Sequence, residues 1–163
     1  MVRPKNRGFT LIELLAVILI MGVVSGVLVL SADLASGQAK VREEARRFAQ
    51  LMELLCEEAV LQQRELGAWI EPGGYAFRVW ESEIWMPRRA GVFRSRTVPD
   101  ALELQLLIEG KPALADDPAG PPQVVCYSSG ELTPFVLTLA GPGDRRLSVT
   151  GDALGHIEVE PIP

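Results

Sequence analysis

The feature that most constrains this chain is an apolar block close to its amino terminus. Residues 9–30 contain one charged side chain, Glu13, and the eight residues before them carry three basic ones. A helix of this length extends about 33 Å, which matches the roughly 30 Å hydrocarbon core of a bilayer. Basic residues on this side favour a cytoplasmic amino terminus. We therefore expect one membrane-spanning helix, with the rest of the chain on the far side of the membrane.

Three interpretations of this block are open. A cleaved secretory signal has an apolar core of about 7–15 residues followed by a small-residue cleavage site. Here the apolar run is longer, and residues 31–37 match such a site only loosely. A plain signal anchor fits the length but leaves Glu13 unexplained, because an ionised carboxylate in the bilayer costs on the order of 2–3 kcal/mol. The third interpretation gives that carboxylate a partner.

The third interpretation rests on a short motif around this glutamate. A short basic leader is followed by Gly8-Phe9-Thr10-Leu11-Ile12-Glu13. This motif resembles the amino-terminal signal of type IV pilins and of the pseudopilins of type II secretion. The resemblance implies that a prepilin peptidase removes residues 1–8 by cutting between Gly8 and Phe9, and then methylates the new Phe9 amine. The membrane helix would stay attached to the mature chain.

Such a cut would also give Glu13 a role. It places a positive amine on Phe9, and a carboxylate is the natural partner of an amine in a low dielectric. We expect Glu13 of one subunit to pair with the Phe9 amine of another. This pairing offsets the cost of burying the carboxylate only on assembly, and it sets the axial register of the helices. The alternatives are that Glu13 reaches the lipid headgroups or pairs with its own amine.

A second helical pattern follows the apolar block. Apolar residues recur at steps of four and three, which places them on one face: Val41, Ala45, Phe48, Met52, Leu55 and Ala59. Leu66-Gly67 provides a stop, because glycine takes the left-handed conformation at a helix end. We expect residues 31–67 to continue the helix outside the membrane, with this apolar stripe holding a globular head.

Residues 68–163 show the alternating runs and turn residues of a β-rich head. We expect about seven short strands, at 74–80, 83–86, 102–108, 123–127, 135–139, 146–150 and 156–159. The first two should form a hairpin through Glu81-Ser82. Short strands at close spacing favour an antiparallel sheet or two packed sheets. The expected fold class is therefore α+β, a pilin-like fold with a long amino-terminal helix packed on this head.

Within the family, the head resembles the minor pseudopilin of the H type, GspH. The similarity is strongest in the amino-terminal third and in residues 127–135 (YSSGELTPF). It implies a low-copy assembly subunit near the tip of a periplasmic pseudopilus, anchored in the bacterial inner membrane and supporting export across the outer membrane. The implied partners are other minor and major pseudopilins, the prepilin peptidase and the inner-membrane assembly platform. The alternative is a minor type IV pilin subunit that serves pilus assembly or DNA uptake.

Two cysteines raise the question of a disulfide. Cys56 lies in the expected helix and Cys126 in an expected strand. A periplasmic head allows disulfides to persist, and a bridge here would join helix to sheet across a long loop. Two separate buried thiols explain the sequence equally well, so both arrangements stay open.

A basic segment is the candidate interaction loop. It contains Phe93 and no acidic residue, and its four arginines are Arg88, Arg89, Arg94 and Arg96. Arginines beside an aromatic bind phosphates and bases, whereas a protein contact or plain solvation explains the loop as well. The net charge of −5 argues against a general polyanion binder. Nucleic acid is therefore not an expected partner.

Catalysis and metal binding are not expected. The chain has one histidine, His156, which excludes a multi-histidine metal site. Ser128 and Ser129 lack the Gly-x-Ser-x-Gly context of a nucleophile and fit a β-turn. Asp116 and Asp117 lack the further spaced oxygen ligands of a calcium site. We expect no cofactor, no metal and no enzymatic activity.

Overall fold

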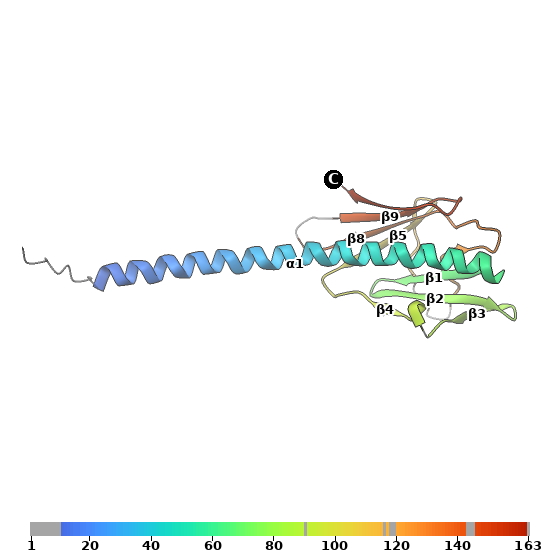
Figure 1. Ribbon diagram of the computed structural model, residues 1–163, viewed down its shortest axis with the longest axis horizontal. Helices are drawn as coiled ribbons and strands as arrows, with labels where there is room; N and C mark the ends of the chain where they lie inside the picture. Colours follow the sequence, from blue (N-terminus) through green and yellow to red (C-terminus); the bar gives the residue numbers. More distant parts are fainter. Residues whose placement is uncertain (1–10, 90, 116, 118–119, 143–145, 163) are drawn as a thin grey trace, which may run out of the picture. The chain divides into compact units, whose positions relative to one another are not determined.

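The computed structural model describes residues 11–89, 91–115, 117, 120–142 and 146–162, with backbone alone for 26–36. The chain divides into two compact units, one ending at Ser36 and one beginning at Gly37. The helix α1 (Leu11–Gln62) is followed by ten strands and a short 3-10 helix, η1 (Gly91–Phe93), within the described residues. Figure 1 shows this order along the chain. The predicted α+β class is confirmed.

The first unit contributes the amino-terminal part of α1. Residues 11–25 are all exposed, and most of them are large and apolar. Among the described residues, no helical segment combines the length and the apolar character that crossing a membrane requires. The span predicted at 9–30 begins outside the described residues, and the side chains of 26–30 also lie outside them.

The second unit contains two antiparallel sheets. Sheet A has the order β3-β2-β1-β7, with β4 also paired to β2, and sheet B has the order β10-β9-β8-β5-β6. The strands of sheet A are β1 (Leu66–Glu71), β2 (Gly74–Glu81), β3 (Ile84–Pro87), β4 (Arg96–Thr97) and β7 (Val124–Cys126). The strands of sheet B are β5 (Glu103–Ile108), β6 (Lys111–Pro112), β8 (Phe135–Ala140), β9 (Arg146–Gly151) and β10 (Ile157–Ile162). Of the two arrangements predicted, the head adopts the two-sheet one.

The apolar stripe of α1 packs against both sheets, as predicted. Its six residues are each at most 2% exposed. The ring of Phe48 meets Tyr75 of β2 edge-on with centroids 5.1 Å apart, and Phe135 of β8 at 6.1 Å. Within this unit, Figure 1 shows sheet A on one side of the helix and sheet B on the other. The helix therefore supplies one surface on which both sheets bury their inner faces.

The predicted hairpin is confirmed with a small shift in its turn. Strand β2 pairs with β3 in a register that sets Trp80 opposite Trp85. The two turn residues are Ser82 and Glu83, both with positive φ, at 52° and 66°. Positive φ at both central residues matches the right-handed twist of the flanking strands. The turn therefore lies one residue beyond the predicted Glu81-Ser82.

The predicted end of the helix was wrong. The helix ends at Gln62, and Gln63 takes the left-handed conformation, with φ 51°. Gly67 instead lies inside β1, where an added Cβ would come within 2.4 Å of Pro122 Cγ. Gly67 therefore lets β1 and the segment at Pro122 approach each other closely, and it does not cap the helix.

Removing the ring of Phe48 should destabilise the head strongly, because this side chain is fully buried between both sheets. We predict that Phe48→Ala lowers the free energy of unfolding by about 3–5 kcal/mol. Chemical unfolding of the full chain in detergent measures this loss. The matched control is Gln50→Ala on the exposed side of the same helix, expected to stay within about 0.5 kcal/mol of the parent. Equal losses in the two variants would contradict the packing argument.

Candidate processing and assembly sites

The predicted processing junction, Gly8-Phe9, lies outside the described residues. The described part of the helix begins at Leu11, and Glu13 lies exposed on it. The flanking apolar side chains of Ile12 and Leu14 are 76% and 54% exposed. An exposed apolar surface of this extent marks a site of contact with lipid or protein. The first unit therefore presents one carboxylate within an exposed apolar surface.

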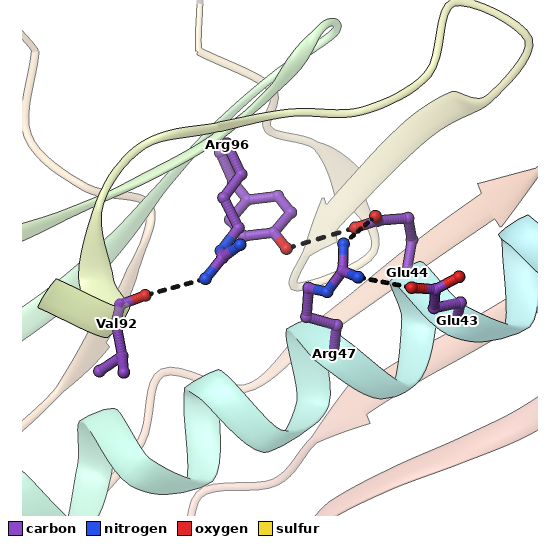
Figure 2. Close-up of polar contacts among 6 residues, drawn as sticks. Glu43, Glu44, Arg47, Val92 and Arg96 are labelled. Atoms are coloured by element: carbon purple, nitrogen blue, oxygen red, sulfur yellow. Dashed lines mark hydrogen bonds and ion pairs between the residues drawn. The ribbon is translucent and has the colours of Figure 1, made fainter.

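In the head, a charged network ties α1 to sheet A. Figure 2 shows the guanidinium of Arg47 between the carboxylates of Glu43 and Glu44. Arg47 Nη2 lies 2.6 Å from Glu43 Oε1, the pairing expected from their spacing of four residues. Glu44 is buried, at 8% exposed, and pairs with the other Arg47 nitrogen. Local spacing gave no sign of a role for Glu44, because it does not show that this side of the helix faces β2.

Tyr75 on β2 is the strand partner in this network. Its hydroxyl donates to Glu44 Oε2 at 3.5 Å. Burial raises the pKa of the Tyr75 phenol far above its ordinary value, and the nearby Glu44 carboxylate raises it further. The phenol therefore stays protonated and remains a donor to Glu44 at every physiological pH.

The four arginines of the predicted interaction loop have different surroundings. Arg88 Nη1 lies 2.8 Å from Glu58 Oε1 on α1, and its guanidinium stacks 4.6 Å from the centroid of Phe93. Arg96 Nη2 donates to the carbonyl oxygen of Val92 at 3.2 Å, as Figure 2 shows. Arg89 and Arg94 are exposed. Arg88 thus fixes the loop to α1, and Arg96 bonds within the loop, which favours a structural role for two of the four arginines.

The two cysteines form a disulfide between α1 and β7. The Cα atoms of Cys56 and Cys126 are 5.0 Å apart, and the residues are separated by 70 positions. Of the two arrangements that the sequence left open, the structure contains the bridge. It joins the end of the helix to sheet A.

A buried arginine on the outer face of sheet A was not anticipated. Arg78 of β2 is 6% exposed, and its guanidinium lies 4.9 Å from the centroid of the Trp69 ring. Its Nη1 donates to the carbonyl oxygen of Gly120. Burial lowers the pKa of Arg78, and Asp117 opposes that shift. The arginine thereby holds the segment before β7 against the sheet, a role that strand alternation alone does not reveal.

The remaining polar candidates are turns. Gly130 N donates to Tyr127 O at 3.0 Å, which makes residues 127–130 the predicted β-turn around the two serines. Asp152 Oδ1 accepts from the backbone N of His156 at 2.9 Å, and this bond lowers the pKa of Asp152. The described residues contain no group of three His, Cys, Asp or Glu side chains placed to hold a metal, and Asp116 lies outside them. The bonds of Gly130 and Asp152 thus hold two turns in place.

Comparison with known proteins places this architecture in a family. The prokaryotic N-terminal methylation motif matches residues 3–29, and the type II transport protein GspH matches residues 44–155. Type II secretion system protein H of Pseudomonas aeruginosa is 38% identical, over 95% of this chain and 96% of that protein. The Aeromonas hydrophila protein of the same name is 32% identical, over 84% and 82%. The solved minor pseudopilin EpsH of the Vibrio cholerae type 2 secretion system has a TM-score of 0.62 and 25% identity, over 74% of this chain and 94% of EpsH.

The motif and the fold together define a class of protein. A methylation motif ahead of a long helix, with two antiparallel sheets packed on the second half of that helix, defines a protein of the pilin-like class. Because the GspH match spans more than half of the chain, the chain belongs to the GspH family of type II transport proteins. The resemblance to H-type minor pseudopilins noted in the sequence is confirmed.

Opening the disulfide should weaken the head, because a crosslink across 70 positions removes much of the freedom of the unfolded chain. We predict that Cys56→Ala with Cys126→Ala lowers the free energy of unfolding by about 4 kcal/mol. Denaturant titrations with and without reductant measure this loss. Reductant should weaken the parent chain and leave the double variant unchanged. A parent whose stability does not respond to reductant would contradict the assignment.

Proposed function

We propose that this chain is a non-enzymatic assembly subunit of a type II secretion pseudopilus, held in the inner membrane by one helix with its head in the periplasm. The observation that carries the proposal is the presence of two family matches in one chain: the methylation motif at 3–29 and GspH at 44–155. As a member of this family the chain is a membrane-anchored pseudopilin that assembles with other pseudopilins. Its particular neighbours, and its contacts with the prepilin peptidase and the assembly platform, belong to the proposal.

The proposed maturation begins with cleavage of the leader. Prepilin peptidase would remove residues 1–8 and methylate the Phe9 amine, leaving 9–30 as the membrane helix. The match of the methylation motif to residues 3–29 supports this step. Beyond the membrane, the helix would continue to Gln62, and the β-rich head would begin at Leu66.

Glu13 would then set the register between subunits. In a bilayer its carboxylate is costly unless a cation lies beside it. Pairing with the Phe9 amine of a neighbouring subunit would supply that cation and fix the axial offset between otherwise apolar helices. The exposed apolar side chains on either side of Glu13 support this role, because they offer a neighbour a surface without polar obstacles.

Within the second unit, three kinds of contact attach the head to α1. The apolar stripe, the Cys56–Cys126 disulfide and the Arg88–Glu58 ion pair all join α1 to the sheets. A subunit held in a fibre by its helix would pass any displacement of that helix to the head through these contacts. This firm attachment suits a subunit whose work is to hold a position in an assembly.

The processing step predicts the mass of the mature chain. In cells with an active prepilin peptidase, we expect intact-mass spectrometry of the membrane form to show a chain that begins at Phe9 and carries one added methyl group. Gly8→Leu should block the cut and leave Met1 in place. A chain that keeps Met1 despite an active peptidase would contradict the proposed maturation.

The register role predicts a selective defect. We expect Glu13→Leu to leave membrane insertion and cleavage intact, since the change makes the helix more apolar. Incorporation into the pseudopilus should fall, because the Phe9 amine of the neighbour loses its carboxylate. Co-purification with other pseudopilins measures incorporation, and Glu13→Asp is the matched control that keeps the charge. Full incorporation of the leucine variant would rule out the register role.

A further inference from the structure

A cleft lies in the head between α1 and the last two strands of sheet B. It encloses about 240 Å³, with α1 on one side and β9 and β10 on the other. The pairing of these strands sets Leu147 opposite Pro161 and Arg146 opposite Ile162, so both strands contribute to one wall. The other wall begins at Gln38, directly after the residue at which the second unit starts. The cleft therefore lies at the end of the head where the helix enters it.

The floor of the cleft is apolar, and close packing holds its two walls together. Val41 is 2% exposed, and Leu147 and Ile162 are half-buried. Gly141, just before β9, lies so close to the helix that an added Cβ would come within 2.4 Å of Val41 Cγ2. This contact fixes the start of β9 against α1. The folded head therefore contains the cleft without any rearrangement.

The rim of the cleft is cationic. Arg42 of α1 and Arg146 of β9 are exposed on it, and Gln38 adds an amide one turn before Arg42. Among the described residues, neither guanidinium has an ion-pair or hydrogen-bond partner, and no acidic side chain lines the cleft. By contrast, Arg47 and Arg88 are paired with glutamates of α1. Two guanidinium groups from different elements thus attract an anion to one cleft.

A cationic rim above an apolar floor selects an anion that also has an apolar part. Arginine binds phosphate through two parallel hydrogen bonds, and the floor offers contact to CH groups. The volume equals that of about eight water molecules and is below the roughly 300–1,000 Å³ of sites for drug-sized ligands. Within the described part of the chain no aromatic ring lines the cleft, so it lacks the faces on which nucleic-acid bases stack. The headgroup and glycerol of a phospholipid match this chemistry and this size.

The place of the cleft in the sequence keeps it near lipid. Gln38 follows the predicted span of 9–30 by eight residues. Eight residues extend about 12 Å as a helix and at most about 29 Å when fully stretched. A tether this short gives the headgroups a millimolar effective concentration at the cleft, so a weak site is sufficient. The net charge of the whole chain is −5, so the attraction to an anionic lipid is local to this rim.

We propose that this cleft binds the headgroup of an anionic phospholipid of the membrane that anchors the chain. Arg42 and Arg146 contact the phosphate, and Val41, Leu147 and Ile162 cover the glycerol. The proposal rests on the proposed function, because that function places the helix in a membrane with the head beside it. The bound lipid holds the head of the unassembled subunit against the bilayer. Withdrawal of the helix into a fibre removes the cleft from its lipid, so the contact is confined to the stored subunit.

Lipid photo-crosslinking of the full-length chain tests the site. The chain is reconstituted into nanodiscs of equal parts phosphatidylglycerol and phosphatidylcholine, which share a phosphate and differ in net charge. With a photoreactive residue at Gln38, mass spectrometry should find phosphatidylglycerol adducts in about fivefold or greater excess over phosphatidylcholine adducts. The same photoreactive residue at Leu154, in the turn at the other end of β9, should form no lipid adduct. Equal adducts of the two lipids at Gln38, or lipid adducts as abundant at Leu154, overturn the proposal.

Neutral variants show whether the two arginines cause the selectivity. Arg42→Gln with Arg146→Gln should lower the adduct ratio to about one. The matched control, Arg89→Gln with Arg94→Gln, removes the same charge from exposed positions of the predicted interaction loop and should leave the ratio unchanged. Because neither cleft arginine has a partner in the described head, the thermal midpoint should stay within about 2 °C of the parent. A ratio that persists without the two cleft arginines, or that falls equally in the control, overturns the proposal.

Two further comparisons separate the possible failures. Replacing chloride by inorganic phosphate at equal ionic strength should leave the adduct ratio unchanged, and a fall to one would assign the cleft to a free anion instead of a lipid. If the parent chain is cleaved, inserted and incorporated while its adducts do not distinguish the two lipids, only the lipid site is wrong. If the parent chain is neither cleaved nor incorporated in cells that carry the secretion system, the proposed function itself fails.

Discussion

The burial of one helix face between two sheets is the interaction on which the rest of the head depends. Sheets A and B form separate hydrogen-bonded ladders, yet the inner residues of both belong to a single apolar core. Phe48 contacts an aromatic ring from each sheet, so the two sheets are held together largely through α1. Neither sheet could bury its inner face alone, because each needs a second layer against it.

The same helix serves different purposes on different sides. Its apolar stripe makes the core, and its lateral charges attach it to the sheet side: Glu44 accepts from Tyr75 of sheet A, and Glu58 pairs with Arg88 of the predicted interaction loop. The outward side of the helix is exposed. This division lets one helix hold the core of the head and still keep an exposed side, since a residue that faces the core does not compete with one that faces solvent.

Sequence patterns predicted the parts of the fold that depend on periodicity. The stripe from Val41 to Ala59 and the β2–β3 hairpin follow from side-chain spacing and turn residues, and both are confirmed. The helix end was misplaced because Gln63 adopts the left-handed conformation that glycine usually provides. The bond from Arg78 to Gly120 and the burial of Glu44 depend on contacts across 42 and 31 residues, which local spacing does not encode. Family resemblance supplied the processing junction between Gly8 and Phe9, which lies outside the described residues.

The covalent link between α1 and β7 has a consequence for the order of events in biogenesis. Thiols stay reduced in the cytosol and become oxidised in the periplasm. Cys56 lies in α1 and Cys126 lies 70 residues later in β7, so their bond closes only once β7 has come beside the helix. If the head lies in the periplasm, as proposed above, the subunit is completed only after translocation, and the oxidising compartment separates finished heads from nascent ones.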